Sequence, residues 1–198
     1  IFADGFDGEV VAVCEPLQLL QDTSFEASLT GGPWTSTSTN FGTGLCDEAS
    51  CGTGGGSAVP HTGNVWVWMG GTTAAETTTA SQSVVIPAGS ERHLNYWLFV
   101  GALGGAGAEL SINVDGTTVD TVAEPAVVDA GYSQRTVDLS SFADGASHTI
   151  EFSLNAPASA EVSNFSLDDV TLECEPSVTG AVPLPLGPVG GSRARIQN

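Results

Sequence analysis

Residues Val162–Cys174 read VSNFSLDDVTLEC, and the apolar pattern of this stretch decides how the chain folds. The apolar side chains fall into two pairs of opposite strand parity: Phe165 with Leu167, and Val170 with Leu172. Since alternate side chains of a strand point to opposite faces, a regular strand cannot bury both pairs. One extra residue at Asp168-Asp169 would restore the pattern, as a β-bulge does. We therefore predict a closing strand that is kinked at two carboxylates and ends in a cysteine.

The start of the chain mirrors this end. Cys14 and Cys174 each begin a Cys-Glu-Pro triplet, and Glu26 follows a phenylalanine in a short predicted strand, Thr23–Leu29. We expect the first and last strands to pair, with a Cys14–Cys174 disulfide closing the seam. We also expect Glu26 and the two adjacent aspartates to share a cation, because clustered carboxylates otherwise repel one another.

These motifs carry a family resemblance. Phe-Glu in the first strand and Asp-Asp-Val-x-Leu in the last resemble the jelly-roll sandwiches of MAM domains and of several carbohydrate-binding modules. Three further segments resemble bacterial secreted modules of that group: Val59–Gly63 (VPHTG), Ile86–Gly89 (IPAG) and Leu94–Gly101 (LNYWLFVG). The resemblance covers roughly Leu19 to Leu172. It implies an all-β fold, a single antiparallel jelly-roll β-sandwich.

The resemblance also implies a bound ion and a location. Such domains typically hold a structural Ca²⁺ where these acids converge, which makes Glu26, Asp168 and Asp169 the implied ligands here. It implies a protein that is secreted or displayed on the cell surface, in bacteria. MAM domains have a cysteine close to the Phe-Glu pair, whereas Cys14 lies well upstream. The disulfide pattern is therefore not that of the animal family.

Composition limits the size of the fold and the choice of partners. The 198 residues suffice for one sandwich, and 41% of them are apolar, so that a core can form. The formal net charge is −19, with four arginines and no lysine. This leaves no basic patch for nucleic acid and disfavours adsorption to an anionic membrane. No stretch is long and apolar enough to span a bilayer.

Four cysteines, an even number, indicate two disulfides and an oxidising compartment. Cys46 and Cys51 are separated only by DEAS, so we pair them with each other and Cys14 with Cys174. Zinc ligation by Cys46, Cys51 and His61 is the alternative, with a looser spacing than zinc sites usually show. No signal peptide is visible, and we expect a mature or processed form.

The sequence predicts about ten strands at the spacing of a sandwich. The strongest are Val65–Met69 and His93–Gly101, and Asp115-Gly116 is the two-residue turn of a hairpin. A long Gly-rich loop, Phe41–His61, contains the closely spaced cysteine pair. Loops of this length are usually functional or disordered, and a small disulfide would hold this one.

Three tryptophans are candidate ligand-binding residues. Trp34 begins a predicted strand, while Trp66 and Trp68 share one face of Val65–Met69. Stacked indoles on one face could form a platform for a sugar. The alternative is that these rings pack in the core or under a loop.

The ends of the chain differ in character from the middle. We divide it into an N-terminal extension or added strand (1–13), the jelly-roll sandwich (14–176) and a Pro/Gly-rich C-terminal arm (177–198). The prolines exclude a central strand or a helix from the C-terminal arm. The candidate assembly residues are Val10, Val11, Val13, Pro183, Pro185, Arg193 and Arg195. A positive tail could contact the acidic body of another copy, and such contacts make rings or open filaments.

No catalytic motif is present: Gly-x-Ser-x-Gly, His-Glu-x-x-His and the P-loop are all missing from the sequence. We therefore predict a non-catalytic extracellular protein. The first hypothesis is a structural subunit that self-assembles through its arms, as a homo-oligomer or polymer, into a fibre or surface layer. The alternative is a carbohydrate-binding or adhesion module of a secreted enzyme, with a polysaccharide as partner. A hydrolase ranks last.

Overall fold

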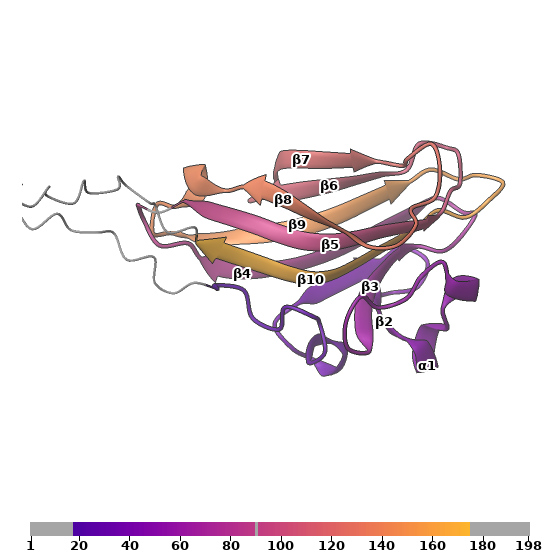
Figure 1. Cartoon of the computed structure of the whole chain (residues 1–198), viewed down its shortest axis with the longest axis horizontal. Coiled ribbons are helices and arrows are strands. Elements are labelled where there is room, and N and C mark those ends of the chain that lie inside the picture. The colour runs from indigo at the N-terminus through magenta and orange to yellow at the C-terminus, as the bar shows by residue number, and fades with distance from the viewer. Residues whose placement is uncertain (1–17, 90, 175–198) are drawn as a thin grey trace, which may run out of the picture.

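The computed structural model describes residues 18–89 and 91–174, which form two antiparallel sheets of five strands each (Figure 1). This is the single antiparallel sandwich that the sequence predicts. The two predicted arms lie outside the described residues, and so do Cys14 and all seven candidate assembly residues. In the described ranges, no helix has the length and apolar character that crossing a membrane requires.

One sheet, called here the β4 sheet, has the strand order β1-β4-β9-β6-β7. Its strands are β1 (Thr35–Ser38), β4 (Glu76–Val85), β9 (Ser147–Ala156), β6 (Glu109–Val114) and β7 (Thr117–Ala123). The predicted hairpin joins β6 to β7, and its two turn residues, Asp115 and Gly116, have φ angles of 51° and 77°. Positive φ at both central residues is what a type I′ turn requires.

The other sheet, the β10 sheet, has the order β2-β3-β10-β5-β8. Its strands are β2 (Leu45–Asp47), β3 (Val65–Gly70), β10 (Asn164–Cys174), β5 (Arg92–Ala102) and β8 (Ser133–Asp138). A short helix, α1 (Glu48–Cys51), follows β2 directly, and Figure 1 shows it beside β2 and β3. Three single 3₁₀ turns complete the description: η1 (Ser28–Thr30), η2 (Gly54–Gly56) and η3 (Ser140–Phe142).

The bulge predicted in the closing strand is present. The register of β10 against β5 shifts between Asp168 and Thr171, and Asp169 has a left-handed φ of 45°. As a result, the four apolar side chains on the two sides of the bulge are all 0% exposed: Phe165, Leu167, Val170 and Leu172. The change of parity in the sequence therefore marks the bulge correctly.

The predicted strand Thr23–Leu29 is wrong, because this segment consists of turns followed by η1. The carboxylate of Asp22 accepts hydrogen bonds from the backbone N–H groups of Ala27 and Ser28, which folds the segment back on itself. Phe25 has a φ of 62°, a costly conformation for a bulky residue, and yet its side chain is 0% exposed. Burial of the ring offsets that cost.

The predicted contact between the two ends of the domain is present but lies further upstream. An antiparallel bridge joins Gln18 to Glu173, and the N–H of Leu19 donates to the carbonyl of Leu172 over 3.1 Å. Gln18 Oε1 also accepts a hydrogen bond from the N–H of Leu172. The start of the described chain therefore runs along the edge of β10 without forming a full strand.

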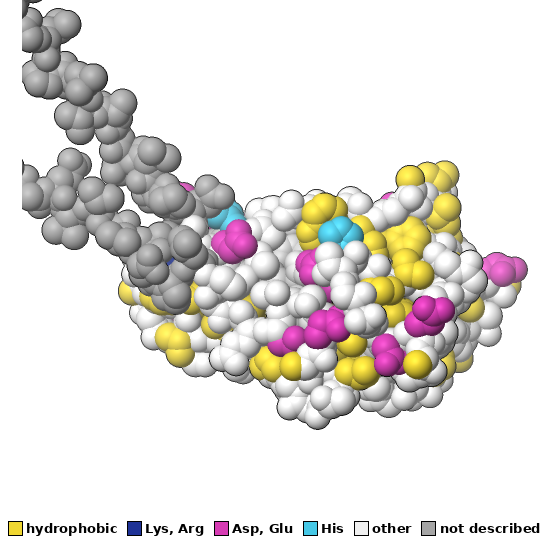
Figure 2. All heavy atoms as spheres, turned by 60° about the horizontal axis from the view of Figure 1, so that its bottom comes forward, with side chains coloured by type: hydrophobic (Ala, Val, Ile, Leu, Met, Phe, Trp, Pro, Cys, Tyr) yellow, Lys and Arg dark blue, Asp and Glu magenta, His cyan; other side chains and the backbone are white. Residues whose placement is uncertain are grey.

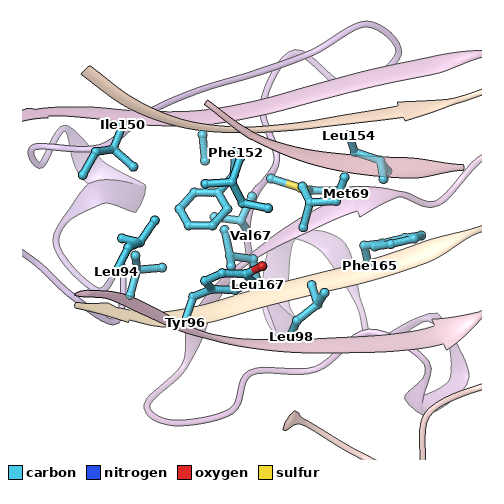
Figure 3. Packing of buried hydrophobic residues seen from close by; sticks show 14 of the residues in the cluster. Val67, Met69, Leu94, Tyr96, Leu98, Ile150, Phe152, Leu154, Phe165 and Leu167 are labelled. Carbon is cyan, nitrogen blue, oxygen red and sulfur yellow. The ribbon is translucent and has the colours of Figure 1, made fainter. Parts of the chain in front are cut away.

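The core lies between the two sheets (Figure 3). The β10 sheet contributes Val67, Met69, Leu94, Leu98 and Leu167 among others, and the β4 sheet contributes Ile150, Phe152 and Leu154. Tyr96 and Phe152 meet edge to face across the layers, with ring centroids 5.1 Å apart. Each large side chain buried in this way contributes about 1.5–3 kcal/mol to stability.

His148 on β9 is held between two carboxylates. Its Nδ1 lies 2.7 Å from Asp115 Oδ2 and its Nε2 lies 3.0 Å from Asp144 Oδ1, while the side chain is only 8% exposed. The hydrogen bonds to Asp115 and then to Asp144 raise the pKa of His148 above its ordinary 6.5. Hydrogen bonds to Thr149 and His148 lower the pKa of Asp115 below 3.8, and those to Ala146 and His148 do the same for Asp144.

These shifts predict a pH optimum for the contribution of His148 to stability. A raised histidine pKa gives stability that is complete below about pH 6.5 and is lost as the pH rises through the folded-state value. The lowered aspartate values give stability that is lost at acidic pH. We expect His148→Gln to lower the melting temperature more at about pH 5.5 than at about pH 8.5. Equal losses at both pH values, with the wild-type protein melted in parallel, would contradict this.

Candidate functional site

A groove of ≈ 600 Å³ opens beside β2, β3 and α1. We call it the aromatic groove, and it is lined by Leu29, Phe41, Thr43, Leu45, Cys46, Ser50, Cys51, Trp68, Gly70 and Gly71. Its volume falls in the usual range of small-ligand sites. The lining is mostly apolar, with hydroxyl groups from Thr43 and Ser50, and binding sites for organic ligands typically combine the two.

Trp68 on β3 provides one wall of the groove, and its orientation is fixed. The indole Nε1 donates to Asn164 Oδ1 over 2.9 Å, and Asn164 Nδ2 in turn donates to Ser57 Oγ over 2.7 Å. Gly71 lies against the ring, because a Cβ there would be 3.2 Å from Trp68 Nε1. The half-buried indole therefore presents a face to the groove without freedom to turn.

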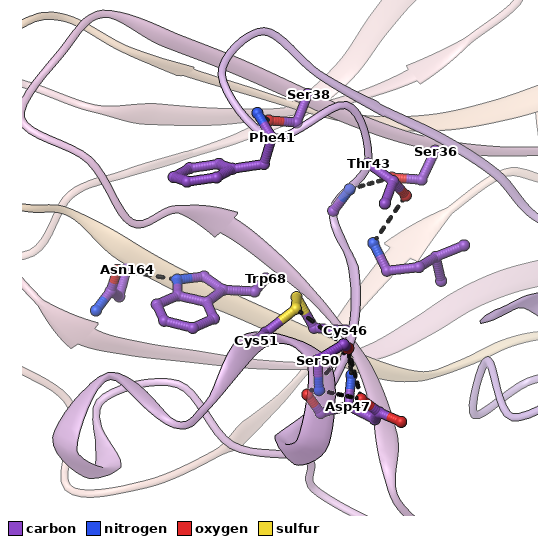
Figure 4. The surroundings of a disulfide bond; sticks show 12 residues. Ser36, Ser38, Phe41, Thr43, Cys46, Asp47, Ser50, Cys51, Trp68 and Asn164 are labelled. Atoms are coloured by element: carbon purple, nitrogen blue, oxygen red, sulfur yellow. Dashed lines mark hydrogen bonds between the residues drawn. A yellow bond between two sulfur atoms is a disulfide. The ribbon is translucent and has the colours of Figure 1, made fainter.

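Phe41 stands on the other side of the groove (Figure 4). It is one of the most exposed large apolar side chains of the described residues, at 60% exposure. Its backbone N–H donates to Ser38 Oγ over 3.0 Å, and the N–H of Gly42 donates to the carbonyl of Ser38 over 3.0 Å. The turn after β1 therefore fixes the backbone from which an exposed aromatic ring projects.

The Trp68 side of the groove also contains the disulfide that joins Cys46 to Cys51 (Figure 4). It ties α1 to β2, and Asp47 caps α1 by accepting the N–H of Ser50 over 2.7 Å. Hydrogen bonds from Ser50 lower the pKa of Asp47. Because the two sulfur atoms are bonded to each other, zinc ligation by this pair is wrong. Cys174 is disulfide-bonded too, and its predicted partner lies outside the described residues.

The three tryptophans proposed as ligand platforms separate into two groups. Trp34 is 3% exposed, with its Nε1 donating to the carbonyl of Asp22, and Trp66 is 0% exposed. Neither ring can meet a ligand at the surface, so their assignment as binding residues is corrected to packing. Trp68 alone of the three reaches the groove.

The three acidic residues predicted to bind calcium surround one loop, residues 61–64, and the first residue of β3, Val65. Asp168 Oδ2 accepts the backbone N–H groups of His61 and Thr62, over 2.7 and 3.1 Å. Asp169 lies 2.6 Å from His61 Nδ1 and also accepts the hydroxyl of Thr62. Glu26 accepts the N–H groups of Asn64, which ends the loop, and of Val65. These acids therefore clamp the loop onto the outer face of the β10 sheet.

The environment of Asp168 is unusual for a carboxylate. Burial raises its pKa to about 7, although backbone hydrogen bonds from Thr62 and Asp169 oppose the rise. His61, whose backbone it holds, stacks on Trp97 with ring centroids 4.1 Å apart. The clamp thus places an imidazole flat on an aromatic ring of β5 and covers the outer face of the β10 sheet.

The clamp does not form a metal site by its acidic side chains alone. No group of three or more His, Cys, Asp or Glu side chains in residues 18–89 and 91–174 is placed to hold a metal ion. Five of the contacts to Glu26, Asp168 and Asp169 come from backbone N–H or hydroxyl donors of the loop. Calcium would need further oxygen ligands, such as backbone carbonyls, and its binding stays a prediction.

Sequence reasoning missed Phe41 as a site residue. The signal available was an aromatic residue between Asn40 and Gly42, at the start of a Gly-rich loop. An apolar ring in such a polar turn has no evident core partner. That pattern indicates that the Phe41 side chain is exposed to solvent. Its position opposite Trp68 can be seen only in the folded structure.

Comparisons with known proteins identify the fold. No protein-family model and no curated protein matches the chain. Among solved structures, the module TmCBM61, described in complex with β-1,4-galactotriose, is 17% identical over 80% of this chain and 99% of its own, with a TM-score of 0.56. The K2 cleaved adhesin domain of Lys-gingipain is 16% identical over 75% and 96%, with a TM-score of 0.51. The K3 adhesin domain, from Porphyromonas gingivalis, is 11% identical over 78% and 99%, at 0.50.

These identities show a shared fold and no more. The chain has the β-sandwich fold of carbohydrate-binding modules and adhesin domains, as the resemblance of its motifs implies. Nearly the whole length of each neighbour is matched, so the shared fold extends over the entire sandwich of each of them.

The Cys46–Cys51 disulfide is expected to contribute less to global stability than a disulfide that closes a long loop, because it closes a short one. We expect Cys46→Ala/Cys51→Ala to lower the free energy of unfolding by about 2 kcal/mol and to leave the strand content unchanged. Denaturant unfolding followed by circular dichroism measures both quantities. The double variant is preferable to a reducing agent, which would also reach the disulfide of Cys174. Loss of the folded state would show that the disulfide does more than hold α1.

The calcium prediction has a direct thermal test. We expect excess EDTA to lower the melting temperature and added Ca²⁺ to restore it, because a ligand that binds only the folded state stabilises that state. Glu26→Gln is the matched variant, since it removes one charge at the exposed end of the clamp. An unchanged melting temperature in EDTA and in Ca²⁺ would contradict calcium binding.

Proposed function

We propose that this protein is a non-catalytic module that binds polysaccharide, either as part of a secreted enzyme or as an adhesion domain. The observation that carries the proposal is the aromatic groove, where an exposed ring and a fixed indole flank a mostly apolar hollow. A contiguous exposed apolar surface rimmed by polar residues marks a site of interaction with a ligand or partner. Phe41 and Trp68 supply the faces on which a sugar ring would pack.

Two further observations support the proposal. The neighbours named above are described as a carbohydrate-binding module and as adhesin domains, and one of them is in complex with a galactose trisaccharide. The disulfide of the groove is stable in an oxidising compartment, which supports a secreted or surface-exposed protein, as the sequence predicts. A sandwich with a preformed groove needs no catalytic group to perform such a role.

The first hypothesis from the sequence, self-assembly into a fibre or surface layer, concerns the two arms. The residues proposed for assembly lie outside the described part of the chain. The solved structures that share the fold favour a binding module over an assembly subunit. Self-assembly therefore stays a prediction, and carbohydrate binding becomes the leading proposal.

Binding can be tested with a panel of neutral and acidic polysaccharides in affinity gels, followed by titration calorimetry of any that retard the protein. We expect at least one polysaccharide to bind, and Trp68→Ala to weaken that binding roughly tenfold or more, the loss of about 1.4 kcal/mol. Val127→Ala is the control, because Val127 is 72% exposed and lies outside the groove. Absence of binding to every polysaccharide, or full binding by folded Trp68→Ala, would overturn the proposal.

A further inference from the structure

The two aromatic rings of the groove lie on opposite sides of it, with the open volume between them (Figure 4). Phe41 comes from the turn after β1, in the β4 sheet, and Trp68 comes from β3, in the β10 sheet. Each face of an aromatic ring is weakly negative, and the C–H groups on the faces of a sugar ring are weakly positive. A sugar ring placed between Phe41 and Trp68 could therefore pack on both.

The groove carries no charge. Its ten lining residues include no acid, no arginine and no histidine, and its two cysteines are bonded to each other. The chain has a formal net charge of −19, and Figure 2 shows acidic side chains scattered over one face of the domain. The two arginines of the described residues are elsewhere: Arg92 is 1% exposed, and Arg135 lies on β8. An anionic ligand would meet repulsion here and find no cation in the groove to pair with.

We propose that the aromatic groove holds one ring of an uncharged sugar chain between Phe41 and Trp68, and that Glu76 is the positioning residue that sets the Phe41 side. This inference rests on the proposed function and adds to it the charge class of the ligand and the residue that builds the clamp. Glu76 itself does not line the groove.

A set of hydrogen bonds ties Glu76 to the turn that carries Phe41. Glu76, at the start of β4, is 1% exposed, and its carboxylate accepts hydrogen bonds from the three consecutive residues that lead into Phe41, Ser38 to Asn40, and from Thr78 on its own strand. The donors are Ser38 Oγ (2.7 Å), the N–H of Thr39 (3.0 Å), the N–H and side-chain amide of Asn40 (3.0 Å for the N–H) and Thr78 Oγ1 (2.9 Å). Ser38 Oγ also accepts the N–H of Phe41, so the carboxylate reaches Phe41 through a single hydroxyl.

The ionised form of Glu76 is the one that fits this turn. Burial alone would raise its pKa, but the hydrogen bonds from Ser38, Asn40 and Thr78 outweigh burial and lower it. A carboxylate accepts at both oxygens, whereas an amide of the same shape accepts at one and donates from the other. Glu76→Gln would therefore turn a donor toward the two Asn40 groups that face it, the backbone N–H and Nδ2, which are donors too, and release the turn.

The charge class is tested with matched ligands. The probes are β-1,4-galactan, arabinoxylan and hydroxyethylcellulose, each with a carboxymethylated form of the same polymer, and calorimetry gives the dissociation constants. We expect at least one neutral polymer to bind and its carboxymethylated form to bind at least roughly tenfold more weakly at low salt, with the gap narrowing in about 0.5 M NaCl. Equal or tighter binding of the charged form would overturn the inference and leave the proposed function standing. Failure of all six polymers would overturn both.

The role of Glu76 is tested with a double-mutant cycle on the same polymer. We expect Phe41→Ala and Glu76→Gln each to weaken binding about five- to tenfold, and the double variant to be no weaker than Phe41→Ala alone, because residues that act through one another are not additive. Additive losses, or full affinity in Glu76→Gln, would exclude a positioning role. Ser38→Ala, which removes the hydroxyl between Glu76 and Phe41, gives the same reading if Glu76→Gln does not fold. Val127→Ala again serves as the control.

Discussion

The bulge in β10 is the constraint on which the rest of the structure depends. Consecutive residues of a regular strand point to opposite faces. The left-handed backbone at Asp169 breaks this rule, so that Asp168 and Asp169 both bond to His61 and Thr62. The same extra residue returns Val170 to the core. One backbone irregularity therefore completes the hydrophobic layer and at the same time creates the clamp for the loop.

The clamp in turn shapes the groove. The segment between β2 and β3 is held at its far end by the two aspartates and at its near end by the Cys46–Cys51 disulfide. Between these two anchors, Ser57 accepts from Asn164, which orients the indole of Trp68. Without both anchors, a Gly-rich segment of this length would have little reason to keep one conformation. The orientation of Trp68 in the groove therefore depends on residues of β10, the last strand of the described chain.

Sequence patterns correctly predicted the features that depend on residues close to one another in the sequence. Parity located the bulge, Asp-Gly located the β6–β7 hairpin, and spacing paired Cys46 with Cys51. The features that depend on a particular side-chain hydrogen bond, or on partners distant in the sequence, were missed. Phe25 looks like a strand residue by its apolar character, but the carboxylate of Asp22 folds its segment into turns. Trp66 and Trp68 have the same parity and similar neighbours, and only the path of the loop above them decides which is buried.

Composition explains how so acidic a chain can still be well ordered. With four arginines against 23 acids, most carboxylates cannot pair with a cation, and many accept backbone N–H groups instead. Examples are Asp22, Glu26, Asp47, Glu76, Glu124 and Asp168. Such charge-assisted hydrogen bonds are short and directional, so each acid fixes a particular turn or loop. The carboxylates that repel anions at long range therefore also hold, by hydrogen bonds, the turn that carries Phe41 and the loop beside Trp68. None of them lines the groove between these two rings, so the groove itself is uncharged.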